Sequence, residues 1–336
     1  MRARWVFAVG LLASVAGCQS LAYYTQAIGG HLRVLAKARP VEDWLADPAT
    51  PPDLKDRLAT ARRIREFASK NLKLPENNSY LAYAELNRPY VVYNVFAAPE
   101  FSVEPKQECF PFTGCVSYRG FYSEDDARRH AARLRAAGYD VYVGGVAAYS
   151  TLGWFDDPLL STFIRYSDAQ LARLVFHELA HQVVYARDDT TFNESFAVTV
   201  EEEGVRRWLE FENRSGELAA FRAAQARKRE LADRVSQARE RLAVVYRMDL
   251  PREAMLEHKR GEWERLRALY PALPPEPNNA FLASIAVYTE LVPAFERLLA
   301  ESGSLESFYR RVKKLARAGQ PDRDAFFTKA GYRRSS

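Results

Sequence analysis

Hydrophobic and polar positions predict a small group of strands in the first half of the chain. Residues 89–96 are rich in β-branched and aromatic side chains, which is typical of a strand. Residues 115–122 and 139–150 are further strand candidates. In the segment 123–137 a serine precedes three acidic residues, which is the pattern of a capped helix.

Helical spacing of apolar residues dominates the rest of the chain. Residues 21–72 predict helices with a break at Pro51–Pro52, because proline disrupts a helix interior. The long charged segment 201–264 predicts a helical hairpin packed on the core. Four prolines make residues 270–279 a predicted loop. Residues 280–301 predict one last strong helix before a basic tail that we expect to fray. The fold class that follows is α+β and mainly helical.

The most informative helical turn is His177-Glu178-Leu179-Ala180-His181. Histidines four residues apart on a helix lie about 40° apart around its axis and one turn apart along it, so both imidazoles can bind one ion. Glu178 lies between them, where its carboxylate can reach a water on that ion. This is the H-E-x-x-H pattern of zinc peptidases. The alternative is a helix with surface histidines, which the apolar flanking residues disfavour.

Glu194 is the predicted third ligand. A turn-forming stretch follows the first helix, so a second helix from about Asn193 to Leu209 can bring Glu194 back to the histidines. Glu201 lies seven residues further on, on nearly the same face, and is either a competing ligand or a carboxylate that bonds a ligand imidazole. Two histidines and one glutamate leave a fourth tetrahedral position open for water, so the predicted cofactor is Zn²⁺.

Hydrolysis at such a site needs a general base and a hydrogen-bond donor to the oxyanion. Glu178 would take a proton from water and pass it to the leaving amine. Tyr288 is the predicted donor to the oxyanion, with Tyr149 as the alternative.

The predicted third strand has a further expected role. It would pair with the extended substrate, and Gly144-Gly145 would permit close approach. Three carboxylates are unranked candidates for binding a substrate ammonium: Asp156, Asp157 and Glu201.

The N-terminus has the pattern of a targeting segment. Arg2 and Arg4 precede an apolar run, residues 5–16, that is short for a membrane span. Val15-Ala16-Gly17-Cys18 resembles the bacterial lipobox, so we expect residues 1–17 to be a signal peptide and Cys18 to be lipidated. By resemblance to Gram-negative lipoproteins, Gln19 rather than Asp after this cysteine favours the outer membrane, with the protein anchored in the lipid bilayer and facing the periplasm. The alternative is a plain secretory signal with an incidental cysteine.

Charge and cysteine usage narrow the expectations further. The net charge is +5, and no glycine-rich phosphate loop or basic-aromatic stripe is present, so we expect no nucleic-acid module. Export permits a disulfide, and the proline and glycine between Cys109 and Cys115 favour the turn that would close it. We expect one peptidase region over 18–336. Its predicted parts are N-terminal helices (18–88), a core (89–210), a long helical insertion (211–270) and a C-terminal helical part (271–336).

Several segments together resemble the bacterial family of predicted aminopeptidases. They are the lipobox, Cys109-Phe110-Pro111, residues 114–120, residues 148–158, the His177–His181 turn, Asn193-Glu194-Ser195-Phe196-Ala197 and Asn278-Asn279-Ala280. The resemblance covers most of the mature chain. It implies a zincin-like metallopeptidase core, a peptide substrate and aminopeptidase action.

Residues 193–197 are also similar to the Asn-Glu-x-Phe-Ala segment of gluzincin aminopeptidases. The interval from His181 to Glu194 is shorter than in those enzymes, and their amine-binding Gly-Ala-Met-Glu-Asn segment is absent in that form. A metallo-endopeptidase or cell-envelope hydrolase with the same zinc site therefore stays open. So does a non-enzymatic envelope lipoprotein with a vestigial zinc site.

Overall fold

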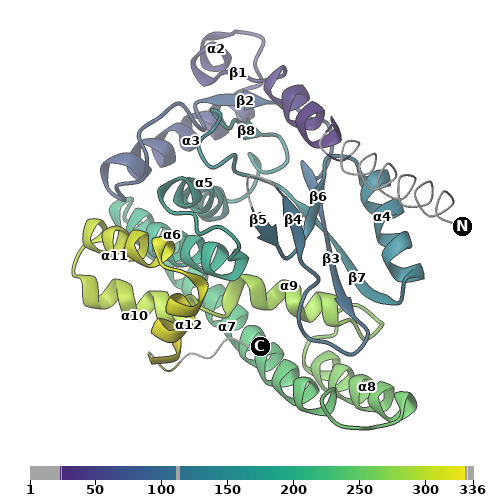
Figure 1. The fold of residues 1–336 in the computed structure, drawn as a ribbon. Helices are drawn as coiled ribbons and strands as arrows, with labels where there is room; N and C mark the ends of the chain where they lie inside the picture. The colour runs from purple at the N-terminus through teal and green to yellow at the C-terminus, as the bar shows by residue number, and fades with distance from the viewer. Residues whose placement is uncertain (1–22, 24, 111–113, 330, 332–336) are drawn as a thin grey trace, which may run out of the picture.

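The computed structural model describes residues 23, 25–110, 114–329 and 331. It is mainly helical with small sheets, which confirms the predicted α+β class (Figure 1). Cys18 and the predicted signal peptide lie outside the described residues. Among the described helices, none combines the length and apolar character that a membrane crossing requires.

The first part of the chain forms helices and one edge of the molecule. Residues 25–35 are helical. The predicted proline break is confirmed, since Pro51 and Pro52 begin α3. Short strands also occur within 18–88, where only helices were expected, and they form a sheet with a later strand in the order β1-β2-β8. These elements are β1 (Arg39–Pro40), α2 (Val41–Ala46), α3 (Pro52–Lys70), β2 (Ala82–Ala84) and β8 (Leu159–Leu160).

A second, antiparallel sheet has the order β6-β3-β7. Its strands are β3 (Val92–Pro99), β6 (Arg119–Phe121) and β7 (Tyr139–Val146). The side chains of β3 alternate between two environments. Tyr93 and Val95 pack against Ala127 of α4 (Glu124–Ala136) on one face. Phe96, on the other face, packs with Ala280 of α9 (Asn279–Thr289).

Sequence patterns located these elements with two corrections. The α4 cap is confirmed, because Ser123 Oγ accepts a hydrogen bond from Asp126 N at 3.3 Å. The predicted strand 115–122 is instead two strands, β5 (Gly114–Val116) and β6, because the chain bends at residues 117–118. β5 pairs with β4 (Glu108–Phe110) rather than with β3. The predicted strand 139–150 ends at Val146.

Two buried helices lie at the centre of the molecule, α5 (Asp168–Val183) and α6 (Thr190–Phe211). They pack closely against each other, and Gly204 shows how closely. A Cβ at Gly204 would lie 2.7 Å from the Phe176 ring, so only glycine fits this approach without a shift of the neighbours. The close packing holds the predicted metal helix against the helix that carries Glu194.

The remaining elements are α7 (Ser215–Val245), α8 (Arg252–Leu269), α9, α10 (Val292–Ser302), α11 (Leu305–Arg317) and α12 (Gln320–Lys329). The predicted hairpin is confirmed, since α7 and α8 share a core that includes Leu242 and Trp263. The single helix predicted over 280–301 is wrong. It breaks after Glu290, where Leu291 N donates to Ser195 Oγ at 3.2 Å and α10 begins with a proline in its first turn.

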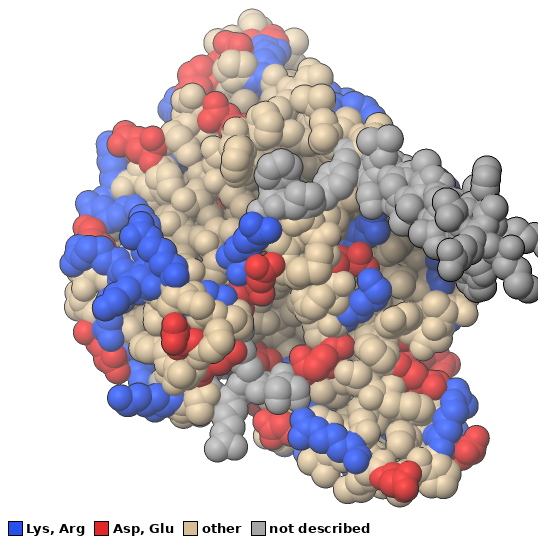
Figure 2. Space-filling view, viewed as in Figure 1, with Lys and Arg blue, Asp and Glu red and all other residues tan. Residues whose placement is uncertain are grey.

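The tail was expected to fray, and for residues 305–329 this prediction is also wrong. Residues 305–317 form the amphipathic helix α11, which buries Leu305, Phe308 and Val312. The basic residues responsible for the expectation lie on its other side, and Figure 2 shows Lys and Arg gathered over α11. Helix α12 follows and buries Phe327 against Phe192 and Phe295.

Candidate metal centre and active-site cavity

Helices α5 and α6 bring three of the predicted ligands together. His177 and His181 are one turn apart on α5, and their Nε2 atoms lie 3.2 Å apart. Oε2 of Glu194, near the N-terminal end of α6, lies 3.2 Å from His177 Nε2 and 3.6 Å from His181 Nε2. All three residues are buried, and none is more than 9 % exposed. This is a group that could hold a metal ion.

The turn between the helices explains why Glu194 faces the histidines. Asn193 donates to Ala186 O at 2.8 Å and accepts from Ala186 N at 2.7 Å, which closes the turn. Asp189 caps α6 by accepting from Phe192 N at 3.1 Å. Glu194, the next residue after Asn193 on α6, therefore has its side chain toward α5.

Glu201 lies on the outer side of His177. Its Oε2 is 2.8 Å from His177 Nδ1, and both its oxygens accept from Arg173 Nη1, at 3.1 and 3.2 Å. Because an ionised carboxylate can only accept, His177 Nδ1 carries a hydrogen toward Glu201, and Nε2 is the nitrogen that faces Glu194. Of the two roles predicted for Glu201, the geometry matches the carboxylate that orients a ligand imidazole.

Charge in this cluster favours a cation. Burial opposes charge on His177, but hydrogen bonds with Glu194 and Glu201 outweigh it and raise its pKa to about 10. Burial also opposes charge on Glu194, yet His181 and His177 lower its pKa to about 2. The lone pairs that attract a proton here are the ones that would bind a metal ion.

Glu178 lies beside the cluster without joining it. It is 7 % exposed and lines the same cavity as His177 and His181. Burial raises its pKa above the ordinary value, and the charges of Glu194 and Glu201 add to this effect. A carboxylate with a raised pKa, in contact with the cavity, has the properties of a general base.

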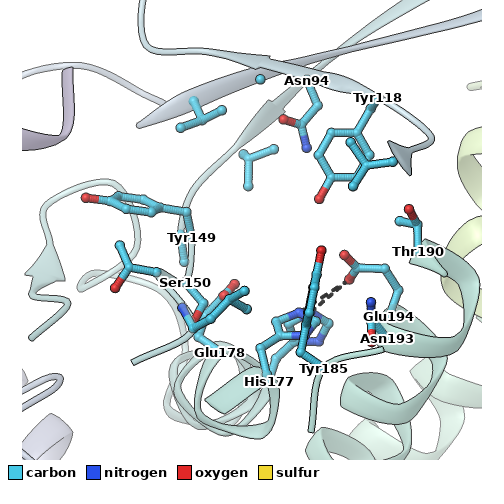
Figure 3. A pocket seen from close by; sticks show the side chains of 18 of the residues that line it. Asn94, Tyr118, Tyr149, Ser150, His177, Glu178, Tyr185, Thr190, Asn193 and Glu194 are labelled. Atoms are coloured by element: carbon cyan, nitrogen blue, oxygen red, sulfur yellow. Dashed lines mark hydrogen bonds and ion pairs between the residues drawn. The ribbon is translucent and has the colours of Figure 1, made fainter. Parts of the chain in front are cut away.

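A cavity of about 650 Å³ lies between the metal-binding group and the sheet β6-β3-β7. Its wall is mostly apolar and aromatic, and it includes Tyr118, Tyr149, Trp154, Phe155 and Tyr185. In Figure 3 the Tyr118 hydroxyl points into the cavity toward Glu194. Sequence reasoning missed Tyr118, because it follows from the bend that divides the expected strand 115–122.

The two predicted oxyanion donors differ in position. Tyr288 of α9 lines the cavity, and neither it nor Tyr118 makes a side-chain hydrogen bond within the described residues. Tyr149 instead shares a 2.7 Å hydrogen bond with His31 Nδ1, and in Figure 3 its hydroxyl points away from the metal-binding group. Tyr288 is therefore better positioned than Tyr149 to meet a substrate at the metal.

None of the three candidates for ammonium binding lies free in this cavity. Asp156 is exposed and accepts from Asn78 Nδ2 at 3.3 Å. Asp157 is buried behind the wall and accepts from Thr151 N at 2.8 Å. Glu201 bonds His177 and Arg173, as described above. The carboxylates that line the cavity are Glu178 and Glu194.

Comparison with known protein families matches residues 22–327 to a family described as "Putative aminopeptidase". The chain belongs to this family. The match spans both metal-binding helices, the sheet and the C-terminal helices, in agreement with the resemblance found in the sequence. Comparisons with curated proteins and with solved structures gave no match.

In this aminopeptidase-family chain the predicted disulfide is present and lies next to the site. Cys109 and Cys115 join β4 to β5. Cys115 N donates to Asp188 Oδ1 at 2.6 Å, and Ser117 N donates to Thr190 Oγ1 at 3.2 Å. The disulfide hairpin is thereby attached to the turn before α6 and to the start of the helix that carries Glu194.

A second cavity of the aminopeptidase-family chain, of about 680 Å³, lies along α7. Its wall includes Glu202, Lys228 and Arg229, so it is more highly charged than the first cavity. His177, Glu178 and Tyr288 line both cavities. The metal-binding group therefore has a cavity on each of two sides.

Proposed function

We propose that this protein is a zinc-dependent peptidase in which His177, His181 and Glu194 hold the metal. The observation that carries the proposal is the spacing of their ligand atoms, 3.2, 3.2 and 3.6 Å. Tetrahedral ligands at zinc–nitrogen and zinc–oxygen distances are roughly 3.3–3.4 Å apart. Three lone pairs facing one another at this spacing fit a divalent cation between them.

The side chains around this group suggest a hydrolytic mechanism. A zinc ion, when bound, polarises the substrate carbonyl and lowers the pKa of water. Glu178 takes a proton from the attacking water and delivers it to the leaving amine. Tyr288 donates a hydrogen bond to the oxyanion that forms. Glu201, itself held by Arg173, keeps His177 in the tautomer that presents Nε2.

Aminopeptidase action is our first candidate, on the support of the family. Two observations favour metallo-endopeptidase action as a second candidate. The carboxylates that line the first cavity are committed to the metal or to proton transfer, so no free carboxylate of the described residues meets a substrate ammonium there. The cavities on both sides of Glu178 also leave room for chain on either side of the scissile bond.

We further propose that the protein is a lipoprotein. Cleavage after residue 17 and lipidation of Cys18 would anchor it in the bacterial outer membrane, facing the periplasm. The short sheet above the metal-binding helices supports a zincin-like core of gluzincin type.

The test is metal analysis and peptide hydrolysis with wild type and Glu178→Gln. We expect about one zinc ion per chain in both proteins. The variant should lose about 10²- to 10⁴-fold in kcat, the range that a general base contributes. Glu66→Gln, an exposed carboxylate on α3, is the matched control and should keep wild-type turnover.

Three results would contradict parts of this proposal. Wild-type protein without metal would refute the ligand assignment. Full turnover by Glu178→Gln would refute the base assignment. Free-amine and N-acetylated peptides separate the two candidates, because cleavage of the acetylated series at internal bonds identifies an endopeptidase.

A further inference from the structure

One amide side chain that borders the first cavity has no hydrogen-bond partner among the described residues. Asn94 lies in the middle of β3, is 6 % exposed and lines the cavity. In Figure 3 its amide points into the cavity, beside Tyr118 and on the side opposite His177. Within the part of the chain that the structure describes, this amide neither donates nor accepts a hydrogen bond. Because buried amides are almost always paired, the amide points to a ligand.

The strand around Asn94 gives no packing reason for an amide. Val92 and Phe96, two residues before and after it, lie on the same face and are buried among apolar side chains. An aliphatic residue would continue this face without leaving polar atoms unpaired. The amide therefore needs an explanation outside the core.

Both cross-strand neighbours of Asn94 are glycines. The register pairs Asn94 with Gly120 on β6 and with Gly144 on β7. A Cβ at Gly120 would lie 3.2 Å from Asn94 Oδ1 and would crowd the amide. A different contact explains the glycine at position 145, since a Cβ there would lie 2.3 Å from the Tyr90 ring. Gly120 lines the cavity, so the missing Cβ there leaves one side of the amide open to the close approach of another backbone, whereas the Tyr142 ring would lie 3.3 Å from a Cβ at Gly144.

We propose that Asn94, between Gly120 and Gly144, is a subsite that binds one backbone peptide group of the substrate. The inference rests on the proposed peptidase function. A carboxamide carries both donors and an acceptor, which match the C=O and N–H of a peptide group. A terminal ammonium is a poorer match, because a buried cation needs a carboxylate and those lining this cavity are Glu178 and Glu194.

Peptide binding in the inactive Glu178→Gln background tests the subsite without cleavage. N-acetylated peptides and esters that replace one backbone amide at a time are titrated by calorimetry. Adding Asn94→Leu, which keeps the size but removes the hydrogen bonds, should weaken binding of the all-amide peptide about 10-fold. In the Glu178→Gln protein, one of the esters should bind about 10-fold more weakly than the all-amide peptide. In the protein that also carries Asn94→Leu, that ester and the all-amide peptide should bind equally. Asn78→Leu, the same change at an exposed asparagine, is the control and should leave binding unchanged.

The outcomes separate the subsite from the proposed function. Equal binding with and without Asn94→Leu, at unchanged zinc content and thermal midpoint, overturns the subsite even if the wild type cleaves peptides. Binding that depends on Asn94 supports the subsite even if the wild type cleaves none. Tighter binding of free-amine than of N-acetylated peptides by the Glu178→Gln protein, with the difference lost on adding Asn94→Leu, overturns the backbone assignment, because the group bound would then be an ammonium. Peptides that do not bind at all overturn both.

Discussion

Two buried carboxylates at the same cavity differ sharply in charge. Glu194 lies between His177 and His181, and its pKa is lowered to about 2 despite its burial. Asp157 lies behind the cavity wall, and burial raises its pKa to about 7. Its Oδ2 accepts from Thr151 N, while Oδ1 has no hydrogen-bond partner among the described residues. The difference shows that partners, rather than burial, decide whether a carboxylate here is charged.

The same dependence on partners holds for two successive contacts behind His177. Arg173 pairs with Glu201, and Glu201 accepts from the outer nitrogen of His177. Each charge in the series is therefore next to an opposite charge or a hydrogen-bond donor. Such an arrangement keeps the inner lone pairs fixed before any ion binds, which lowers the cost of binding one.

The largest effect is expected when the negative charge of Glu194, which His177 and His181 stabilise, is removed. Glu194→Gln replaces the carboxylate that we propose as a metal ligand with an amide, and zinc affinity should fall by more than about 100-fold, beyond the usual range for outer-sphere changes. Competition with a chelator of known affinity measures the change. Glu203→Gln, a carboxylate on the same helix that pairs with Arg206 and Arg207, is the control and should keep the metal. Unchanged affinity in Glu194→Gln would mean that Glu194 is not a ligand.

Local spacing explains which parts of the site could be predicted from the sequence. The placement of His177 beside His181 depends only on helix geometry, and that of Glu194 depends on a short turn. All three positions could therefore be predicted from the sequence. Tyr118 and Asn94 were missed because their roles come from a bend and from two glycines on other strands. The break before α10 likewise depends on Ser195, almost a hundred residues earlier.

The C-terminal tail was misjudged for a different reason. Its net basic charge suggested a frayed end, but Leu305, Phe308 and Val312 recur at helical spacing on α11. Their burial outweighs the repulsion among exposed basic residues, which water and salt screen. The helical spacing of the apolar residues predicts the structure of this segment better than its net charge does.

A smaller effect is expected when the charge behind a ligand is removed. Glu201→Gln keeps an acceptor for His177 but loses the negative charge, so zinc affinity should fall by about 10- to 100-fold. The same chelator competition measures it. Glu202→Gln, at the adjacent position on α6 and paired with Arg229, is the matched control and should change zinc affinity far less. If Glu201→Gln and Glu202→Gln have equal effects, the contact with His177 has no special role.

The smallest effect concerns Asp157 and is a change in how stability depends on pH. Because its folded pKa of about 7 exceeds the ordinary value of 3.8, folding favours the protonated form. This contribution to stability is fully present below about pH 4 and is lost as the pH rises through about 7, at a slope of at most about 1.4 kcal/mol per pH unit. Asp157→Asn cannot ionise, so its free energy of unfolding should fall less between pH 5 and pH 8 than that of the wild type.

Denaturant unfolding at the two pH values provides the measurement, and the neighbouring residue provides the control. Asp156 is exposed and accepts a hydrogen bond from Asn78, so Asp156→Asn should keep the wild-type difference between pH 5 and pH 8. An equal difference in Asp157→Asn and wild type would show that Asp157 is ionised in the folded protein at pH 5. Its burial without a cation would then be offset by hydrogen bonds, and the contrast with Glu194 would no longer rest on charge.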